Sequence, residues 1–217
     1  MALLNLNALL EAPVQKSPFD HCIVPDFIKR EALEGVFTDF PKIDHGGSYP
    51  LSSLEYGKAF GELTSELLDE TTRDAFSSRL GIDLEGRPAT LTVRGRARKK
   101  DGKIHVDSKT KLITVLLYLN PGWAAEEGRL RLLHSPDNIE DVVLEVTPIA
   151  GMMVAFRCTD NAWHGHKPFE GERRAIQLNW VVDQAAARRS QRRHGFSSLL
   201  KRFNPLRREN RRLPAAG

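Results

Sequence analysis

Two periodicities of apolar residues divide the chain. Over residues 26–40 and 56–80, apolar positions recur at helical spacing, which predicts two amphipathic helices. The second ends before Gly81, a residue type that commonly follows a helix C-terminus. A short β-like stretch over residues 22–24 precedes the first helix, and a Gly/Ser-rich stretch over residues 46–50 separates the two.

From residue 89 onward the pattern changes to short aliphatic and β-branched segments, which are separated by turn sequences such as Asn120-Pro121-Gly122. Helices followed by many short strands are typical of an α+β domain, and we expect an antiparallel sandwich or barrel at its core. The predicted strands cover residues 90–93, 112–119, 129–133, 142–146, 152–156 and 175–182.

Composition narrows the class of protein. The 217 residues fit one domain, alone or with a tail, and a hydrophobic content of 41% is enough for an ordinary core. No apolar run approaches the roughly 18 residues of a membrane-spanning helix, and no secretory signal is expected. Cys22 and Cys158 lie too far apart to resemble a disulfide framework. These features exclude collagen, coiled-coil and disulfide-rich classes, and they predict a reducing, cytoplasmic location.

The positive charge is concentrated at the C-terminus. Residues 188–217 carry ten Lys/Arg and one acid, a balance of +9, whereas the whole chain is +4, so the rest is −5. Residues 196–203 have apolar positions at helical spacing, and such a basic segment could dock on RNA, a ribosome or an anionic membrane. It could equally be a solvated extension. The tail supports an alternative function, a catalytically degenerate scaffold or sensor that the tail localises.

Candidate chemistry begins at His105-Val106-Asp107. In an extended segment, His105 and Asp107 project from the same face, so that an imidazole and a carboxylate converge. Trp163-His164-Gly165-His166 could supply a third ligand. Two His and one carboxylate leave open positions on a metal, and this is the ligand set of non-haem Fe(II) oxygenases. Taken alone, the H-x-D pair also fits a surface His beside a turn Asp.

The strand that follows adds a polar face. Alternation places Arg173, Gln177 and Asn179 together, while Arg174 shares the opposite face with Ile176 and other apolar residues. A buried Arg needs an anionic partner, and its planar fork suits a carboxylate. We therefore favour Arg173 over Arg174 as the anion-binding residue, on the argument of faces.

These segments resemble a known family. IHVDSKTKLITVLLYLN, GRLRLL, TPIAGMMVAF and WHGHKPFEGERRAIQLNW are similar to the Fe(II)/2-oxoglutarate-dependent dioxygenases, in particular to the prolyl-hydroxylase branch. The resemblance covers about residues 89–182, and PFDHCIVPDFI is typical of the first strand of that branch. It implies a double-stranded β-helix (a jelly-roll, cupin-like core) over residues 89–184, an N-terminal strand and supporting helices over residues 1–88, and a basic tail over residues 185–217.

The resemblance also implies roles for individual residues. The family spacing favours His164 over His166 as the third iron ligand, which leaves His166 as a wall of the pocket. Gln177 stands where the hypoxia-sensing members have a threonine near the cosubstrate, and it is a candidate for contact with that molecule. The implied iron ligands are His105, Asp107 and His164, and the residues implied to bind the remote carboxylate of 2-oxoglutarate are Arg173 and Tyr118.

The implied function is hydroxylation of an unactivated C–H bond, with Fe(II) as cofactor, 2-oxoglutarate and O₂ as cosubstrates, and succinate and CO₂ as products. L-Ascorbate is a candidate reductant. The substrate stays open between a prolyl or other peptidyl group and a small metabolite. One departure weakens the prolyl alternative: hypoxia-type members have a tyrosine about ten residues before H-x-D, and here Gly95 occupies that offset within a basic stretch, residues 94–103. That stretch is either a mobile lip over the iron that selects an acidic or phosphorylated substrate, or a solvated loop or edge strand protected by charge.

Overall fold

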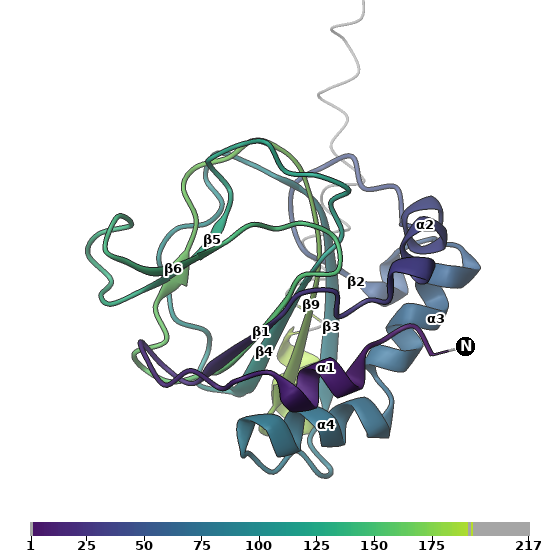
Figure 1. Cartoon of the computed structure of the whole chain (residues 1–217), viewed down its shortest axis with the longest axis horizontal. Coiled ribbons are helices and arrows are strands. Elements are labelled where there is room, and N and C mark those ends of the chain that lie inside the picture. The colour runs from purple at the N-terminus through teal and green to yellow at the C-terminus, as the bar shows by residue number, and fades with distance from the viewer. Residues whose placement is uncertain (1, 191, 193–217) are drawn as a thin grey trace, which may run out of the picture.

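Two antiparallel sheets face one another, and helices cover the outer surface of the larger one (Figure 1). This arrangement is seen in a computed structural model that describes residues 2–190 and 192. Residues 185–190 and 192, where the predicted basic tail begins, are helical, whereas its amphipathic segment at residues 196–203 lies outside the described residues. Within the described part of the chain, no helix has the length and apolar character needed to cross a membrane.

The larger sheet has six strands in the order β1-β7-β4-β9-β3-β2. The smaller sheet has the order β6-β5-β8, and a backbone bridge from His105 to His164 continues it beyond β8. The strands are β1 His21–Val24, β2 Tyr49–Pro50, β3 Ala89–Ala97, β4 Lys111–Tyr118, β5 Leu130–Leu133, β6 Val142–Val146, β7 Met153–Arg157, β8 His164–Gly165 and β9 Gly171–Val181. This is the double-stranded β-helix that the sequence predicts.

The helices precede most of the strands along the chain. Residues 56–80 do not form the single predicted helix, because the chain turns at Leu68 and Asp69 then accepts a hydrogen bond from the backbone N–H of Thr71 at the start of a new helix. This capping stabilises a helix start and explains the break. The helices are α1 Leu6–Glu11, which was not predicted, α2 Arg30–Thr38, the 3₁₀ turn η1 Leu51–Ser53, α3 Lys58–Leu67 and α4 Glu70–Leu80.

Each face of the larger sheet has its own hydrophobic cluster. Leu91, Val93, Leu178 and Trp180 belong to the cluster that includes the helices, together with Phe76 of α4. The cluster between the two sheets is smaller and contains Tyr118, Phe156 and Ala175 among its buried residues. Buried polar residues, among them Thr114, Arg173 and Asn179, lie on the same inner face, so the space between the sheets is where a site can form.

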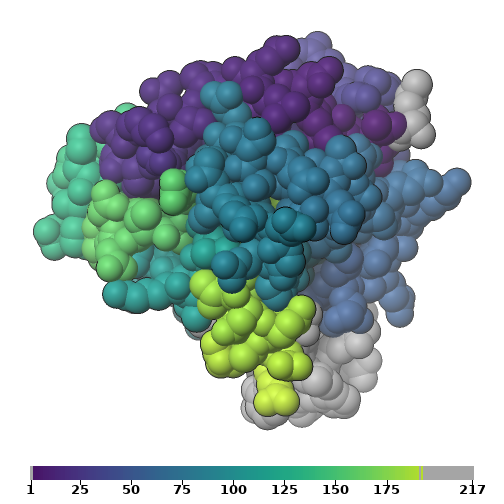
Figure 2. Space-filling view, turned by 90° about the horizontal axis from the view of Figure 1, so that it is seen from below, coloured from purple at the N-terminus to yellow at the C-terminus, as the bar shows by residue number. Residues whose placement is uncertain are grey.

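The N-terminal segment packs beside α4. The backbone N–H groups of Leu3 and Leu4 donate to the carboxylate of Glu66 at 2.7 and 2.9 Å, and Arg79 donates to the carbonyl of Leu10 at 2.9 Å. Figure 2 shows these purple and blue segments side by side on one face of the molecule. The segment thus closes the helical layer that supports the larger sheet.

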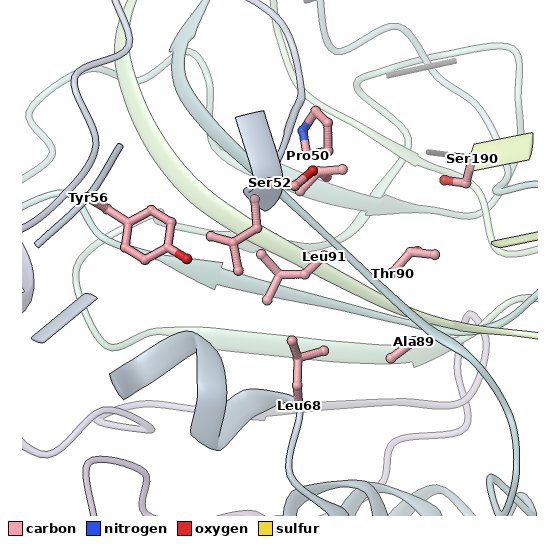
Figure 3. Close-up of a pocket in the computed structure, with 10 residues that line it drawn as sticks. Pro50, Ser52, Tyr56, Leu68, Ala89, Thr90, Leu91 and Ser190 are labelled. Carbon is pink, nitrogen blue, oxygen red and sulfur yellow. The ribbon is translucent and has the colours of Figure 1, made fainter. Parts of the chain in front are cut away.

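A groove lies on the helical side of β3. Tyr56 and Leu68, both exposed, line it together with Leu91 and Ser190, as Figure 3 shows. None of the site residues predicted from the sequence lines this groove.

Strand β3 extends further than predicted and runs into the basic stretch. It pairs with β9 from Ala89 to Ala97, with an irregularity in register between Arg94 and Arg96. At Gly95 the backbone passes close to Ile43: an added Cβ would lie 2.6 Å from the Ile43 Cβ. The glycine is therefore required by close approach of the chain, and Arg94 takes the position that faces the interior of the β-helix.

Candidate metal and 2-oxoglutarate site

Three predicted ligand residues meet between the sheets. One ligand atom from each of His105, Asp107 and His164 lies within 4.8 Å of the other two. The backbones of His105 and His164 exchange two N–H···O hydrogen bonds of 3.0 Å, and their ring centroids are 4.3 Å apart. The pairing of the two segments thus places both imidazoles side by side.

Hydrogen bonds orient both imidazole rings. His105 Nδ1 lies 2.8 Å from the carbonyl oxygen of Lys103, and His164 Nδ1 lies 2.9 Å from that of Ala162. Because a carbonyl only accepts, each Nδ1 carries the proton and donates, which leaves both Nε2 atoms with a lone pair. A backbone partner of this kind fixes the tautomer of a metal-binding His.

The carboxylate of Asp107 accepts hydrogen bonds from two side chains. Lys111 Nζ donates to Oδ1 at 2.7 Å, and the Thr114 hydroxyl donates to Oδ2 at 2.5 Å. Asn179 Nδ2 donates in turn to the Thr114 hydroxyl at 2.7 Å. Burial alone would raise the pKa of Asp107, but the nearby charges of Lys111 and His164 and these hydrogen bonds lower it to about 2.

The donor set fits a divalent metal ion such as Fe(II). Burial first, and then the neighbouring His105, lower the pKa of His164 to about 4, so its imidazole is neutral at pH 7. Asp107 is ionised at the same pH. Two imidazoles and one carboxylate leave part of the coordination sphere open, as oxygenase sites require.

Arg173 lies in the same interior. Its side chain is 8% exposed, its Nε donates to the carbonyl of Gly128 at 2.8 Å, and Nη2 lies 3.4 Å from the Tyr118 hydroxyl. The guanidinium carbon is also 5.2 Å from the centroid of the Tyr118 ring. No carboxylate forms an ion pair with Arg173 among residues 2–190 and 192. Arg173 and Tyr118 together thus offer a cation and a hydroxyl to an incoming anion.

The structure separates the two neighbouring arginines. Arg174 pairs with Glu172 at 2.9 Å and lies over the ring of Phe40, on the outer side of the sheet. Gln177 stands in register with Leu116 and Thr92 on the inner face, between the level of Asn179 and that of Ala175. Its side-chain amide makes no hydrogen bond within the described part of the chain, so the amide is available to a ligand.

His166 is near the cluster without being part of it. Its Nδ1 lies 2.8 Å from the carbonyl of Lys167, and the turn at Gly102 packs on its ring, where an added Cβ would come within 2.3 Å. Burial, and then the charge of Arg173, lower the pKa of His166 to about 4. The residue forms a neutral wall of the interior.

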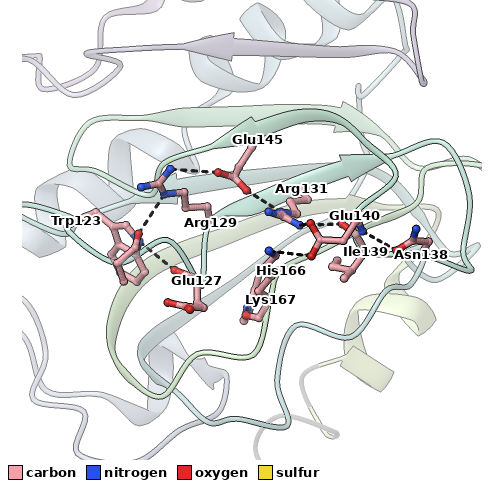
Figure 4. Close-up of polar contacts among 11 residues, drawn as sticks. Trp123, Glu127, Arg129, Arg131, Asn138, Ile139, Glu140, Glu145, His166 and Lys167 are labelled. Atoms are coloured by element: carbon pink, nitrogen blue, oxygen red, sulfur yellow. Dashed lines mark hydrogen bonds and ion pairs between the residues drawn. The ribbon is translucent and has the colours of Figure 1, made fainter.

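A series of ion pairs connects the segment at His166 and Lys167 to the smaller sheet (Figure 4). Lys167 pairs with Glu140 at 2.8 Å, and Glu140 pairs with Arg131 at 3.0 Å. Arg131 also pairs with Glu145 at 2.7 Å, and Glu145 reaches Arg129 at 3.2 Å. Arg131 is itself buried, so these contacts fix the turn after His166 on a rigid base.

Sequence reasoning missed several residues of the site. Lys111 and Thr114 hold Asp107, although they lie only four and seven positions further along the chain. Arg94 was considered only as part of the basic stretch, as a lip or a charged edge, and was given no place of its own in the site. Counting alternation from Val93, which packs in the outer cluster, would have placed Arg94 on the inner face.

Comparison with known proteins agrees with this geometry. The model of the family described as the 2OG-Fe(II) oxygenase superfamily matches residues 95–182, which include all three clustered residues. No curated protein sequence matches the chain.

Solved structures share the fold at low sequence identity. A prolyl-4-hydroxylase from Pseudomonas putida has a TM-score of 0.53 and 16% identity, covering 82% of this chain and 93% of its own. A prolyl 4-hydroxylase from Phytophthora capsici has a TM-score of 0.51 and 17% identity, covering 83% and 68%. HygX from Streptomyces hygroscopicus, solved with nickel and 2-oxoglutarate bound, has a TM-score of 0.52 and 13% identity, covering 76% and 82%.

The family match extends over most of the β-helix and includes the His-Asp-His cluster, and the fold around it is that of prolyl-hydroxylase-like structures. Residues 95–182 are accordingly the oxygenase domain of an Fe(II)- and 2-oxoglutarate-dependent dioxygenase.

Proposed function

We propose that His105, Asp107 and His164 hold the Fe(II) and that Arg173 and Tyr118 bind the distal carboxylate of 2-oxoglutarate. The observation that carries the proposal is the placement of two complementary groups in one interior, a cluster of three candidate metal ligands and a buried guanidinium that has no acidic partner among the described residues. When bound, the iron and its cosubstrate supply the oxidative chemistry. The protein supplies ligands, orientation and a dry cavity.

The residues around the cluster have positioning roles in this proposal. The backbone carbonyls of Lys103 and Ala162 keep both Nε2 atoms directed at the metal. Thr114 and Asn179 hold the Asp107 carboxylate so that one oxygen can face the metal. Gln177, whose amide is unengaged, is a candidate contact for the body of the cosubstrate. Pre-positioning of this kind lowers the cost of ordering ligands when the metal binds.

The reaction that fits is hydroxylation of a C–H bond with release of succinate and CO₂, and L-ascorbate is a candidate reductant. Two similar structures are described as prolyl 4-hydroxylases, which supports a peptidyl group as substrate. The cationic interior supports a further restriction on the substrate, argued in the next subsection.

An anaerobic titration tests the proposal directly. Fe(II) and then 2-oxoglutarate are added to the metal-free protein, and the visible charge-transfer band of the chelate is recorded. We expect a band in the wild type, none in His164→Ala, and in Arg173→Ala a Kd for 2-oxoglutarate raised by about 100-fold, because a buried guanidinium loses its place opposite a carboxylate. Arg174→Ala is the matched control and should titrate like the wild type.

The same titration can contradict the proposal. If the wild type binds Fe(II) but 2-oxoglutarate produces no band, the protein is not a working dioxygenase, and the non-enzymatic scaffold becomes the better explanation. If Arg174→Ala weakens binding and Arg173→Ala does not, the cosubstrate lies on the other face of β9.

We also propose a reducing, cytoplasmic location. Cys22 and Cys158 are both free thiols. Burial raises the pKa of Cys22 to about 11, and burial together with the charge of Asp107 raises that of Cys158 to about 12. Neither thiol is poised as a reactive thiolate, and a compartment without an oxidising system suits them. Localisation of a fluorescent fusion checks this proposal, and export of the fusion contradicts it.

A further inference from the structure

Arg94 is a second guanidinium that faces the interior of the β-helix. It stands in register with Ala175 of β9, and Ala175 stands in register with Tyr118 of β4. Its neighbour Val93 packs in the outer cluster, so alternation directs Arg94 to the inner face. Across the sheet, Arg94 of β3 and Tyr118 of β4 thus lie on either side of Ala175, which has a small side chain. Arg173 lies two residues before Ala175 on β9.

No described side chain pairs with this cation. Within residues 2–190 and 192, the side chain of Arg94 makes no hydrogen bond and no ion pair. The acid beside it, Asp101, is engaged with Arg98 through contacts of 2.7 to 3.2 Å. Burial first, and then the nearby charge of Arg173, lower the pKa of Arg94. An unpaired cation beside a second one in a partly buried space is costly unless a ligand offsets it.

The rest of the basic stretch behaves differently. Arg96 is exposed, and Arg98 is paired with Asp101 at 2.7 Å. The turn that follows packs Gly102 on His166, so residues 98–102 cover one side of the interior. The charges of Asp101 and Arg98 in this segment act on Arg94, and the charge of Arg94 acts on both His166 and Tyr118. Its position is therefore that of a group facing a ligand, not of a solvated edge.

A count of charges indicates what that ligand carries. In the proposed function, Asp107 and the two carboxylates of 2-oxoglutarate bring three negative charges against the five positive charges of Fe(II), Arg173, Lys111 and Arg94. Lys111 contacts Asp107 at 2.7 Å, and Arg173 would contact the distal carboxylate. Among the described residues and the cosubstrate, Arg94 has no anion in contact with it.

We propose that Arg94 determines substrate specificity by pairing with an anionic group, a carboxylate or a phosphate, on the substrate to be hydroxylated. This inference rests on the proposed function and adds the substrate class to it. A planar guanidinium pairs with either anion through two parallel hydrogen bonds. A neutral peptidyl proline without a nearby acid would leave the cation unpaired.

The test uses the full chain loaded with Mn(II) and 2-oxoglutarate, a complex that does not turn over. Acetate and methylphosphonate serve as the two probes, and relaxation of their ¹³C and ³¹P signals by Mn(II) reports binding near the metal. We expect enhanced relaxation of at least one probe in the wild type and in Arg96→Met, and a loss of about tenfold or more in Arg94→Met. Arg94→Lys, which keeps the charge, should retain part of the effect. The probe with the larger enhancement identifies carboxylate or phosphate as the preferred group.

The outcomes separate this inference from the proposed function. In the charge-transfer titration with Fe(II), the Kd values of Arg94→Met and the wild type for 2-oxoglutarate should agree within about threefold. The reason is that Arg94 would contact the substrate, whereas Arg173 would contact 2-oxoglutarate. Equal probe relaxation in Arg94→Met and wild type overturns the inference alone. A tenfold weaker 2-oxoglutarate affinity in Arg94→Met also overturns it, because Arg94 would then belong to the cosubstrate site. Absence of the band in the wild type overturns the proposed function as well.

Discussion

At the scale of single residues, each candidate ligand is oriented by hydrogen bonds from neighbouring groups that would not themselves contact the metal. Asp107 is the clearest example, because its carboxylate is buried and accepts hydrogen bonds from Lys111 and Thr114. The Thr114 hydroxyl has one proton, which it gives to Asp107, and it accepts from Asn179. This relay connects the proposed ligand to the larger sheet, and it uses residues on two adjacent strands.

The relay predicts a specific effect on metal binding. Thr114→Val preserves shape but removes the hydroxyl, so Asp107 loses a donor and Asn179 loses an acceptor. Loss of such a supporting contact typically weakens metal affinity by about 10–100-fold. A Co(II) titration followed by absorbance measures the change, and Thr114→Ser, which keeps the hydroxyl, is the control. Equal affinity in all three proteins would show that Thr114 does not orient Asp107.

For Arg94 we predict that the side chain lowers the stability of the ligand-free protein, because its charge serves a ligand and not the fold. Its guanidinium is partly buried beside Arg173 and has no partner in the part of the chain that the structure describes, so Arg94→Met should raise the free energy of unfolding of the ligand-free chain by about 1 kcal/mol. Urea denaturation measures this, and Arg96→Met, at an exposed position, should change little. A clear destabilisation by Arg94→Met would mean that the side chain has a structural role.

At the scale of elements, the conformation of β3 decides which side chains reach the interior. The irregularity between Arg94 and Arg96 follows the close approach of Ile43 to Gly95. Gly95→Ala would place a Cβ 2.6 Å from the Ile43 Cβ and 3.1 Å from its backbone oxygen. Because backbone cannot yield cheaply, we expect a loss of about 1–3 kcal/mol in unfolding free energy.

The control for this change is also a glycine. At Gly122 an added Cβ meets nothing within 4 Å, so Gly122→Ala should leave the thermal midpoint nearly unchanged. If both variants unfold at the wild-type temperature, the approach of Ile43 does not constrain β3. The comparison isolates the crowding at residue 95 from the general effect of replacing glycine in this chain.

The elements also show what a single sequence can predict. The strands from 112–119 onward, the shared face of His105 and Asp107, and the face of Arg173 follow from alternation, which is a local property of strands. The choice of His164 over His166 came from the spacing in the family that the sequence resembles. The two-residue strand β8 and the break at Asp69 were not predicted. Strand β8 exists because it pairs with β5 and with His105, which are distant in sequence. The break at Asp69 depends on which of several acidic residues caps a helix, and the sequence alone does not distinguish them. The inward position of Arg94 was also missed, because runs of basic residues are usually exposed.

At the scale of the whole molecule, the proposed ligands come from both sheets. His164 lies on β8 of the smaller sheet with His105 bridged to it, whereas Arg173, Tyr118 and the support of Asp107 lie on the larger one. A metal with 2-oxoglutarate would therefore connect the two layers across the inner hydrophobic cluster. The helices cover the opposite face of the larger sheet and are not involved (Figure 1).

This cross-connection predicts that the two ligands stabilise the fold cooperatively. A ligand that binds only the native state at about 100 times its Kd adds about 2.7 kcal/mol to the free energy of unfolding. Thermal unfolding with Mn(II), with 2-oxoglutarate, and with both measures the effect. We expect 2-oxoglutarate alone to add little, because Arg173 and Tyr118 hold only one end of it, and the pair to add more than the sum of the separate effects.

Two variants connect this result to the site. Asp107→Ala should abolish the stabilisation by Mn(II) and with it the cooperative part, since 2-oxoglutarate then lacks the metal that anchors its keto-acid end. Arg174→Ala should retain both, because its side chain lies on the outer face over Phe40. Full stabilisation by 2-oxoglutarate in Asp107→Ala would place its binding site elsewhere than between the sheets, and strictly additive effects in the wild type would mean that the two ligands do not share it.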